Sequence, residues 1–258
     1  MSLTLTVLGS AAAWSERPGR PSSGYLVEHP EGALALDLGQ GSLGALFARR
    51  DPSTLTAVVI SHEHGDHHVD LIPLRTKLRY GYDEPRSIGL HVPDELRRRY
   101  DVFSGEDGFL DDLRGPELEP GTREIGPFEL EARRVRHSQM SFAFRVSERG
   151  RPEGPGLVYS GDCGHAEDLL PLIREGDTLL CEAFWSTLEP IPSAMHLSAS
   201  QAAAVAREGG AARLVLTHIL DAHDPEAAVE AAREAFPGPV VLARPDLVVE
   251  IGALAPTG

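Results

Sequence analysis

The chain has 258 residues, a formal net charge of -15, 41% hydrophobic residues and two cysteines. This composition is typical of a globular protein and excludes disordered, collagen-like and fibrous classes. The negative charge opposes a general attraction to nucleic acid or anionic membranes, and two cysteines do not make a disulfide framework.

The apolar runs of the chain are short. Runs such as residues 57–60 and 214–216 fall far short of the ~20 residues that a membrane-spanning helix needs. The first eight residues alternate like a strand and lack the basic start and apolar block of a signal peptide, so we expect a cytoplasmic protein with no membrane contact. The length fits one large domain, and we predict a single domain over residues 1–258.

Strand-like runs, separated by Gly, Pro and Ser clusters, dominate the first third of the chain. They lie at residues 3–8, 24–28, 33–37 and 55–60. Helical patterns follow, alternating with further apolar strands. The helices are predicted at residues 43–50, 69–80, 93–100, 166–175, 199–208 and 225–236. This mixture favours a layered α/β fold.

Two helix starts place histidines in loops. Ser198 and Gln201 form a capping-box signature, so His196 lies just before a helix. Pro225 follows an aspartate that can act as N-cap, so His218 lies between a strand and the next helix. Turn residues at 28–32 and 148–156 predict two hairpin connections.

Basic residues outnumber acidic ones between residues 71 and 100, against the trend of the whole chain. A solvated helix face explains this pattern, and a phosphate-binding surface is the alternative. The same segment is our prediction for the contact in a possible homodimer.

The segment Ser-His-Glu-His-Gly-Asp-His-His, residues 61–68, follows an apolar strand and precedes a helical pattern. Imidazole nitrogens and carboxylate oxygens are ligands that suit zinc and its neighbours, and catalytic sites leave a position open for water. On composition, a chance His-x-His-x-Asp-His match is expected in roughly one of a thousand such chains. A polar surface loop is the alternative, and the strand and helix on either side favour the metal site.

This segment resembles the signature of the metallo-β-lactamase superfamily, and the resemblance extends over nearly the whole chain. The later motifs resemble the ribonuclease Z and phosphodiesterase branch of that superfamily. Tyr-Ser-Gly-Asp at residues 159–162 resembles its Ser-Gly-Asp motif, and Leu-Thr-His at 216–218 resembles the strand that ends in its last histidine ligand. The resemblance implies an α/β fold of four layers, an αββα sandwich.

The resemblance also implies two divalent metal ions, zinc by preference, with manganese or iron compatible with the same ligands. One ion would be held by His62, His64 and His137, and the second by Asp66, His67 and His218. Asp162 would bridge both ions. A histidine at a strand end or an aspartate in a turn is otherwise an ordinary polar residue, and a two-metal site needs ligands from several strands. His223 is the rival of His218 for the last position.

Three residues are candidates for catalytic roles. His196 falls where ribonuclease Z carries a His-Ser-Thr motif, whose histidine assists departure of the leaving group. Glu182 falls in its His-Glu-Ala-Thr motif and would orient His196, although Cys181 and Phe184 depart from that pattern. Asp66 is counted among the catalytic residues as well as the ligands. His165 and His223 lie near proposed ligands, where supporting roles are possible.

These residues predict a metal-dependent hydrolase that acts through a hydroxide bridging the two ions. The preferred substrates are small cyclic phosphodiesters, nucleotides or short oligonucleotides, without a stable nucleic acid complex. Transfer RNA 3′-end processing is an alternative, but the chain lacks a long basic arm, and Ile219-Leu220-Asp221 replace the family's Ser-x-Arg-Tyr. A lactonase or thioesterase is a further alternative, and a non-catalytic metal-binding scaffold is the last.

Overall fold

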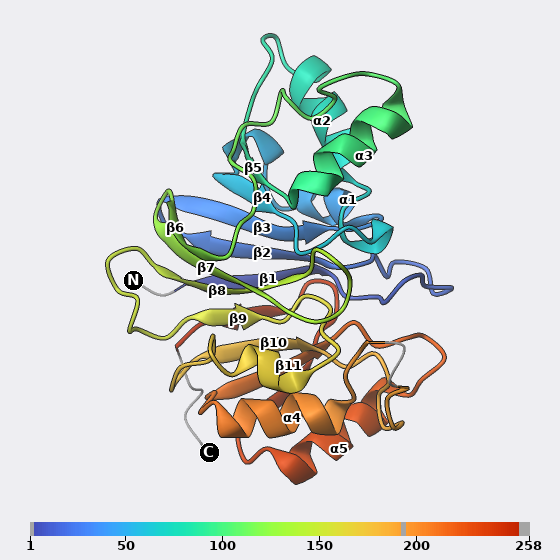
Figure 1. Ribbon diagram of the computed structural model, residues 1–258, viewed down its shortest axis with the longest axis vertical. Coiled ribbons are helices and arrows are strands. Elements are labelled where there is room, and N and C mark those ends of the chain that lie inside the picture. Colours follow the sequence, from blue (N-terminus) through green and yellow to red (C-terminus); the bar gives the residue numbers. More distant parts are fainter. Residues whose placement is uncertain (1–2, 192–194, 253–258) are drawn as a thin grey trace.

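Two β-sheets lie face to face, with helices covering the outer face of each (Figure 1), in a computed structural model that describes residues 3–191 and 195–252. The first sheet contains β1 (Thr4–Gly9), β2 (Gly24–His29), β3 (Gly32–Leu38), β4 (Ala57–Val59), β5 (Gly89–His91) and β13 (Val248–Glu250). Its strands run in the order β13-β1-β2-β3-β4-β5.

The second sheet has the order β12-β11-β10-β9-β8-β7-β6. Its strands are β6 (Gly121–Ile125), β7 (Phe128–Arg134), β8 (Phe142–Glu148), β9 (Leu157–Tyr159), β10 (Thr178–Glu182), β11 (Arg213–Thr217) and β12 (Val240–Leu242). The first sheet is covered by α1 (Ser42–Phe47), α2 (Leu71–Tyr80) and α3 (Asp94–Ser104), and the second by α4 (Ala199–Glu208) and α5 (Pro225–Ala235). The predicted αββα sandwich is confirmed.

Alternating side chains of the central strands fill the layers on either side of each sheet. In β3, Leu34 and Leu36 pack between the two sheets, whereas Ala33 and Ala35 pack against the helices. In β11, Val215 faces the other sheet, and its neighbours face α4 and α5. Because both faces of these strands are covered, they read as continuous apolar runs. The carboxyl ends of the strands therefore emerge from a rigid core.

Several local predictions are confirmed. Ser198 and Gln201 form the capping box that starts α4, and the carboxylate of Asp224 accepts from the amide of Glu226 at the start of α5. The turns at 28–32 and 148–156 connect antiparallel strands, β2 to β3 and β8 to β9.

The predicted helix at residues 166–175 is wrong. The structure has only a 3-10 turn, Ala166–Leu169, followed by turns. Pro171 explains the difference, because proline lacks an amide hydrogen and its ring clashes with the carbonyl four residues earlier. In the basic segment, Arg75 and Arg79 contact Glu106 and Asp112 in ion pairs. Because these pairs compensate the arginine charges, they favour a charge-compensated surface over a phosphate-binding one.

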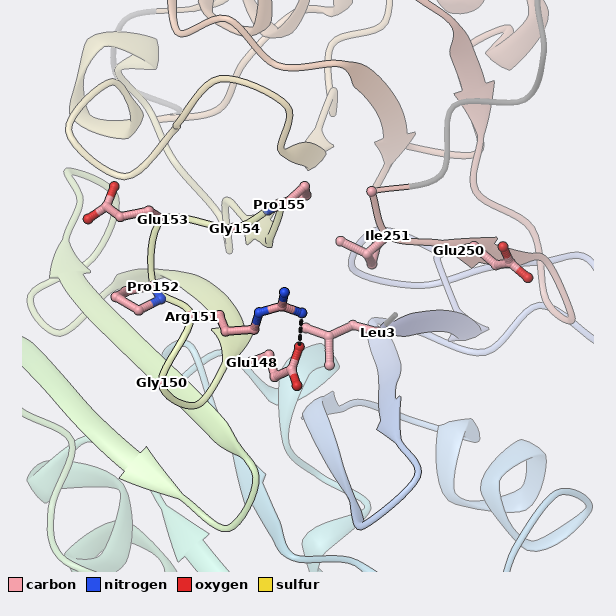
Figure 2. Close-up of a pocket in the computed structure, with 11 residues that line it drawn as sticks. Leu3, Glu148, Gly150, Arg151, Pro152, Glu153, Gly154, Pro155, Glu250 and Ile251 are labelled. Carbon is pink, nitrogen blue, oxygen red and sulfur yellow. Dashed lines mark hydrogen bonds and ion pairs between the residues drawn. The ribbon is translucent and has the colours of Figure 1, made fainter. Parts of the chain in front are cut away.

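A hollow of about 840 Å³ lies beside the hairpin connection and the carboxyl-terminal strand (Figure 2). Two of the charged residues that line it, Glu148 and Arg151, contact each other at 3.4 Å. It contains no histidine, so it is separate from the ligand motif. Among the described residues, no helix is both long and apolar enough to span a bilayer.

A buried ion pair anchors the same hairpin connection. Arg145 and Asp177 are 2% and 0% exposed, and two nitrogens of the guanidinium donate to the carboxylate at 2.8 and 2.9 Å. The carboxylate also accepts from the amides of Gly156 and Arg174. Arg145 donates to two carbonyls of the connection. The pair therefore joins β8, the hairpin connection and the segment at residues 174–177 by hydrogen bonds.

We expect Asp177→Asn to lower the free energy of unfolding by about 3 kcal/mol, because it leaves a buried guanidinium without its counter-charge. Denaturant unfolding followed by circular dichroism measures this change. The matched control is Glu153→Gln on the exposed surface of the same connection, which we expect to leave stability unchanged. Equal stability of Asp177→Asn and wild type would contradict a structural role for the pair.

Candidate metal centre

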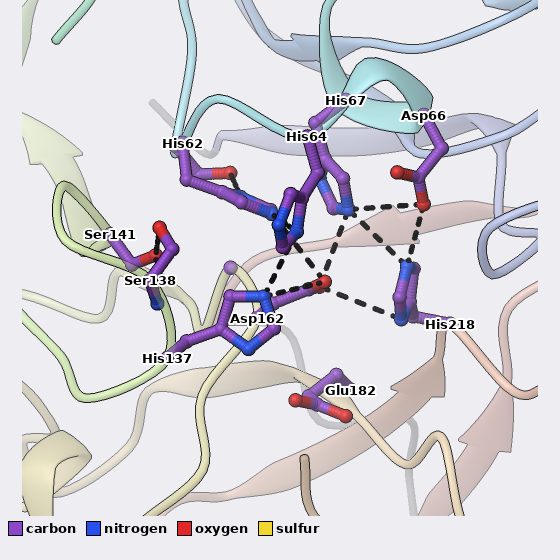
Figure 3. Close-up of polar contacts among 12 residues, drawn as sticks. His62, His64, Asp66, His67, His137, Ser138, Ser141, Asp162, Glu182 and His218 are labelled. Atoms are coloured by element: carbon purple, nitrogen blue, oxygen red, sulfur yellow. Dashed lines mark hydrogen bonds and ion pairs between the residues drawn. The ribbon is translucent and has the colours of Figure 1, made fainter. Parts of the chain in front are cut away.

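Seven histidine and aspartate side chains converge at one edge of the sandwich (Figure 3). Four come from the loop after β4, residues 60–70, where the 3-10 turn Gly65–His67 directs successive side chains inward. The others come from the loop between β7 and β8, from the end of β9 and from the end of β11. All seven residues that the sequence predicts as metal ligands are therefore brought together; they are His62, His64, Asp66, His67, His137, Asp162 and His218.

The first half of the centre contains three imidazoles. Nδ1 of His64 lies 3.0 Å from Nε2 of His62 and 3.1 Å from Nε2 of His137. Two nitrogen ligands of one tetrahedral zinc ion are about 3.3 Å apart, given zinc–nitrogen distances near 2.0 Å. The three nitrogens thus point at one another with the spacing of a shared ion.

The second half contains Asp66, His67 and His218. Nε2 of His67 lies 3.3 Å from Nε2 of His218 and 3.5 Å from Oδ2 of Asp66. The amide of Ala13 donates to that same aspartate oxygen at 2.8 Å, which fixes the carboxylate from outside. His218 has a φ of 54°, a left-handed conformation that non-glycine residues seldom adopt and that often accompanies functional sites.

Asp162 lies between the two halves. Its Oδ2 is 3.6 Å from Nε2 of His62, and its Oδ1 is 3.3 Å from Nε2 of His67. The preceding residue is Gly161, with a φ of 55°, where a Cβ atom would lie 2.6 Å from the carbonyl oxygen of Phe142. Only glycine fits that turn, and the turn places the carboxylate in the gap.

Two buried polar atoms of this centre make no hydrogen bond, Oδ1 of Asp162 and Nδ1 of His218. Such orphaned atoms are costly in a folded protein unless a metal or water satisfies them. The donor set is nitrogen and oxygen without sulfur, which suits zinc, manganese and iron. These residues therefore fit divalent metal ions.

The electrostatics keep three of the donors in the form that binds metal. Burial and the neighbouring imidazoles lower the pKa of His62 and of His64, so both rings are neutral. Burial opposes ionisation of Asp162, but the surrounding histidines lower its pKa well below the usual range. Burial would also lower the pKa of His67, yet the carboxylates around it raise that pKa. A cation bound here would displace the proton of His67.

Asp37, at the end of β3, is a supporting residue that the sequence reasoning missed. It is fully buried, and its carboxylate accepts from Nδ1 of His67 at 2.7 Å, from the amide and hydroxyl of Ser61, and from the hydroxyl of Tyr159. A carboxylate on the far nitrogen of a ligand histidine fixes the ring and its tautomer. The signal in the sequence was a single aspartate inside an otherwise apolar strand.

We expect Asp37→Asn to weaken metal binding by about 10- to 100-fold, because an amide oxygen cannot accept from His67 and Ser61 as a carboxylate does. Competition with a chelator measures the affinity. Tyr159→Phe is the matched control, since it removes one hydrogen bond to Asp37 but leaves the contact with His67, and its effect should be smaller. A folded Asp37→Asn protein with wild-type affinity would show that Asp37 does not support the ligand.

His196 and Glu182 lie beside this centre, and His196 forms a third group of possible ligand atoms with Asp162 and His218. Nδ1 of His196 donates to Oε1 of Glu182 at 2.9 Å, and the same ring nitrogen is 4.0 Å from Oδ2 of Asp162. Glu182 is buried and also accepts from the amides of Cys163, Phe184 and Leu197. Burial alone would lower the pKa of His196, but the charge and hydrogen bond of Glu182 raise it to about 9.

The remaining histidines lie outside the ligand clusters. His223 is absent from every group of possible ligand atoms among the described residues, whereas His218 belongs to two of them. His165 contacts Glu167 at 3.4 Å, and His68 is hydrogen bonded to Tyr100. Burial raises the pKa of the Cys163 and Cys181 thiols, which excludes them as ready nucleophiles.

Comparison with known proteins agrees with this geometry. Residues 36–219 match the model of the beta-lactamase superfamily domain. An uncharacterized protein of Mycobacterium tuberculosis is 35% identical over 250 residues, covering 93% of this chain and 89% of the relative. A ribonuclease Z of Myxococcus xanthus is 29% identical, covering 96% and 98%. The crystal structure of the metallo-beta-lactamase fold protein YhfI from Bacillus subtilis has a TM-score of 0.86 at 24% identity, covering 97% and 100%.

Proposed function

The chain belongs to the beta-lactamase superfamily as a metal-dependent hydrolase, and we propose that it cleaves phosphodiester bonds in small substrates. The observation that carries this proposal is the position of His196. Its imidazole lies next to the carboxylate of Asp162 and is held by the buried carboxylate of Glu182. A protonated group there suits a reaction whose leaving group is an alkoxide, which departs poorly as an anion.

The proposed ligand assignment follows the two halves of the centre. His62, His64 and His137 would hold one ion, Asp66, His67 and His218 would hold the other, and Asp162 would contact both. We propose zinc first, with manganese and iron as alternatives. Two such ions supply a hydroxide nucleophile near neutral pH and neutralise the charge of the phosphodiester.

The residues of the chain do the remaining work. Asp37 holds the ring of His67 in place through Nδ1, and the main chain of Met195 accepts from Nδ1 of His137 at 2.8 Å. Both contacts leave the opposite ring nitrogen facing the centre. Nδ1 of His196 donates its hydrogen bond to Glu182, so Nε2 is the atom that can give a proton to the departing oxygen. Glu182 and Asp37 are thus positioning residues, and His196 is the catalytic acid.

Small cyclic phosphodiesters, nucleotides and short oligonucleotides are the proposed substrates. A net charge of -15 opposes a large polyanion, and Asp221 follows His218 where a basic residue would serve an RNA backbone. The carboxylate of Asp221 accepts hydrogen bonds from Arg20 and Ser15. These bonds hold the loop at residues 10–22 beside the centre. A ribonuclease Z-like activity on transfer RNA is the second candidate, supported by the relative named above.

A substrate panel tests the proposal. The metal-loaded protein is offered bis-p-nitrophenyl phosphate, cyclic nucleotides, a precursor transfer RNA, a lactone and a thioester. We expect turnover of the phosphodiesters and preference for the small ones. Cleavage of the lactone or thioester alone would replace the proposal with a carboxylic ester hydrolase, and preference for the precursor transfer RNA would favour the second candidate.

A further inference from the structure

Phe184 lies directly against His196. The two rings are stacked with centroids 4.3 Å apart and planes 9° from parallel. Other aromatic contacts of His196 are tilted, with His137 at 56° and His218 at 30°. Among the described residues, Phe184 is therefore the only ring that stacks parallel to the imidazole of His196.

The main chain fixes Phe184 relative to the carboxylate that holds the same imidazole. The amide of Phe184 donates to Oε2 of Glu182 at 3.3 Å, and its carbonyl accepts from the amide of Leu220 at 3.4 Å. Phe184 comes two residues after Glu182, just beyond the end of β10. One short segment thus contacts His196 at its Nδ1 edge through Glu182 and on its face through Phe184.

These two contacts restrain different motions. The bond to Cβ and the hydrogen bond at Nδ1 restrain two atoms of the ring, but a hydrogen bond tolerates a range of angles, so the plane can still rotate over a limited range. A ring stacked on the face restricts this rotation, and aromatic pairs contribute stabilisation beyond their buried area. With both restraints, the direction of Nε2 is set. Proton transfer depends strongly on that direction, because catalysis needs the donor aligned with the departing oxygen.

We propose that Phe184 is a positioning residue that holds the plane of His196, so that Nε2 faces the leaving group. This inference rests on the proposed phosphodiester hydrolysis and deepens it. It assigns a role to a residue that departs from the threonine of the related motif. The turnover of substrates whose leaving groups need a proton should depend on Phe184, and the turnover of substrates with good leaving groups should not.

The kinetic test uses Phe184→Leu, which keeps an apolar side chain but removes the flat face. Turnover is measured for a series of aryl and alkyl phosphodiesters whose leaving groups differ in pKa. We expect kcat to fall by about tenfold for the poorest leaving group and by less than about twofold for p-nitrophenolate, with KM unchanged. Phe184→Tyr keeps the flat ring and should restore wild-type values.

Two controls separate positioning from a general loss of packing. Trp185→Leu removes a neighbouring ring that contacts Phe184 and His223, and should leave the leaving-group dependence unchanged. In a His196→Ala background, Phe184→Leu should cause no further loss, because two residues that act through one step are not additive. An equal loss in that background would overturn the proposal.

A measurement that needs no turnover tests the stack itself. The ring protons of His196 lie over the face of Phe184, so their NMR signals should be shifted upfield in protein with labelled histidine. The signals, identified by their loss in His196→Ala, should move downfield in Phe184→Leu. Unchanged signals would refute the stack. If the wild type cleaves no phosphodiester but the shift is present, the proposed function fails and the stacking contact stands.

Discussion

Asp162→Asn is expected to lower phosphodiester hydrolysis by about a thousandfold or more, because metal ions contribute several kcal/mol to the transition state. Asp162 presents one oxygen to each half of the centre, 3.6 Å from His62 and 3.3 Å from His67. An amide of the same shape keeps one acceptor but turns an NH2 group toward the other half. We therefore expect the variant to lose at least one bound ion, measured by elemental analysis.

Asp83→Asn is the matched control for this loss, since Asp83 is an exposed aspartate outside the centre. It should retain full turnover and metal content. Wild-type turnover in Asp162→Asn, with both ions still bound, would refute the bridging position.

His196→Ala is expected to retain its metal ions and to lose activity selectively. General acid catalysis contributes about 10²- to 10⁴-fold, so turnover of alkyl phosphodiesters should fall by roughly 100-fold or more. Because p-nitrophenolate leaves without a proton, bis-p-nitrophenyl phosphate should be cleaved at a rate within about tenfold of wild type. Steady-state kinetics with both substrates, beside metal analysis, measures the difference.

The same loss for both substrates would contradict an acid role and would indicate that His196 supports the metal centre instead. Nδ1 of His196 is only 4.0 Å from Oδ2 of Asp162, so its loss could disturb a proposed metal ligand. Metal content decides it, because a residue that supports the metals lowers occupancy and an acid does not.

The sequence predicted the parts of the centre that carry a local signal. Residues 61–68 concentrate ligand chemistry in one turn, and apolar strands precede both Asp162 and His218. Parallel strands bring their carboxyl ends to one edge of a sheet, so strand-end residues far apart in the chain meet there. β9, β10 and β11 are parallel neighbours, which places Asp162, Glu182 and His218 together.

Contacts that depend on packing gave no such signal. Asp37 lies 30 residues from His67, and nothing in the spacing links an aspartate in an apolar strand to an imidazole. Phe184 was visible only as a departure from a motif, since the parallel stack on His196 depends on the path of the chain after β10. The prediction of a helix around Pro171 was wrong for another reason, because it gave helical periodicity more weight than the proline within the segment.

The measurement that tests the central claim most directly is the rate of bis-p-nitrophenyl phosphate hydrolysis as metal-free protein is titrated with zinc or manganese. Two sets of ligand atoms, with Asp162 between them, predict a rate that rises to a plateau at about two ions per chain. A plateau at one ion, or no hydrolysis at any ratio of metal to protein, would contradict the account.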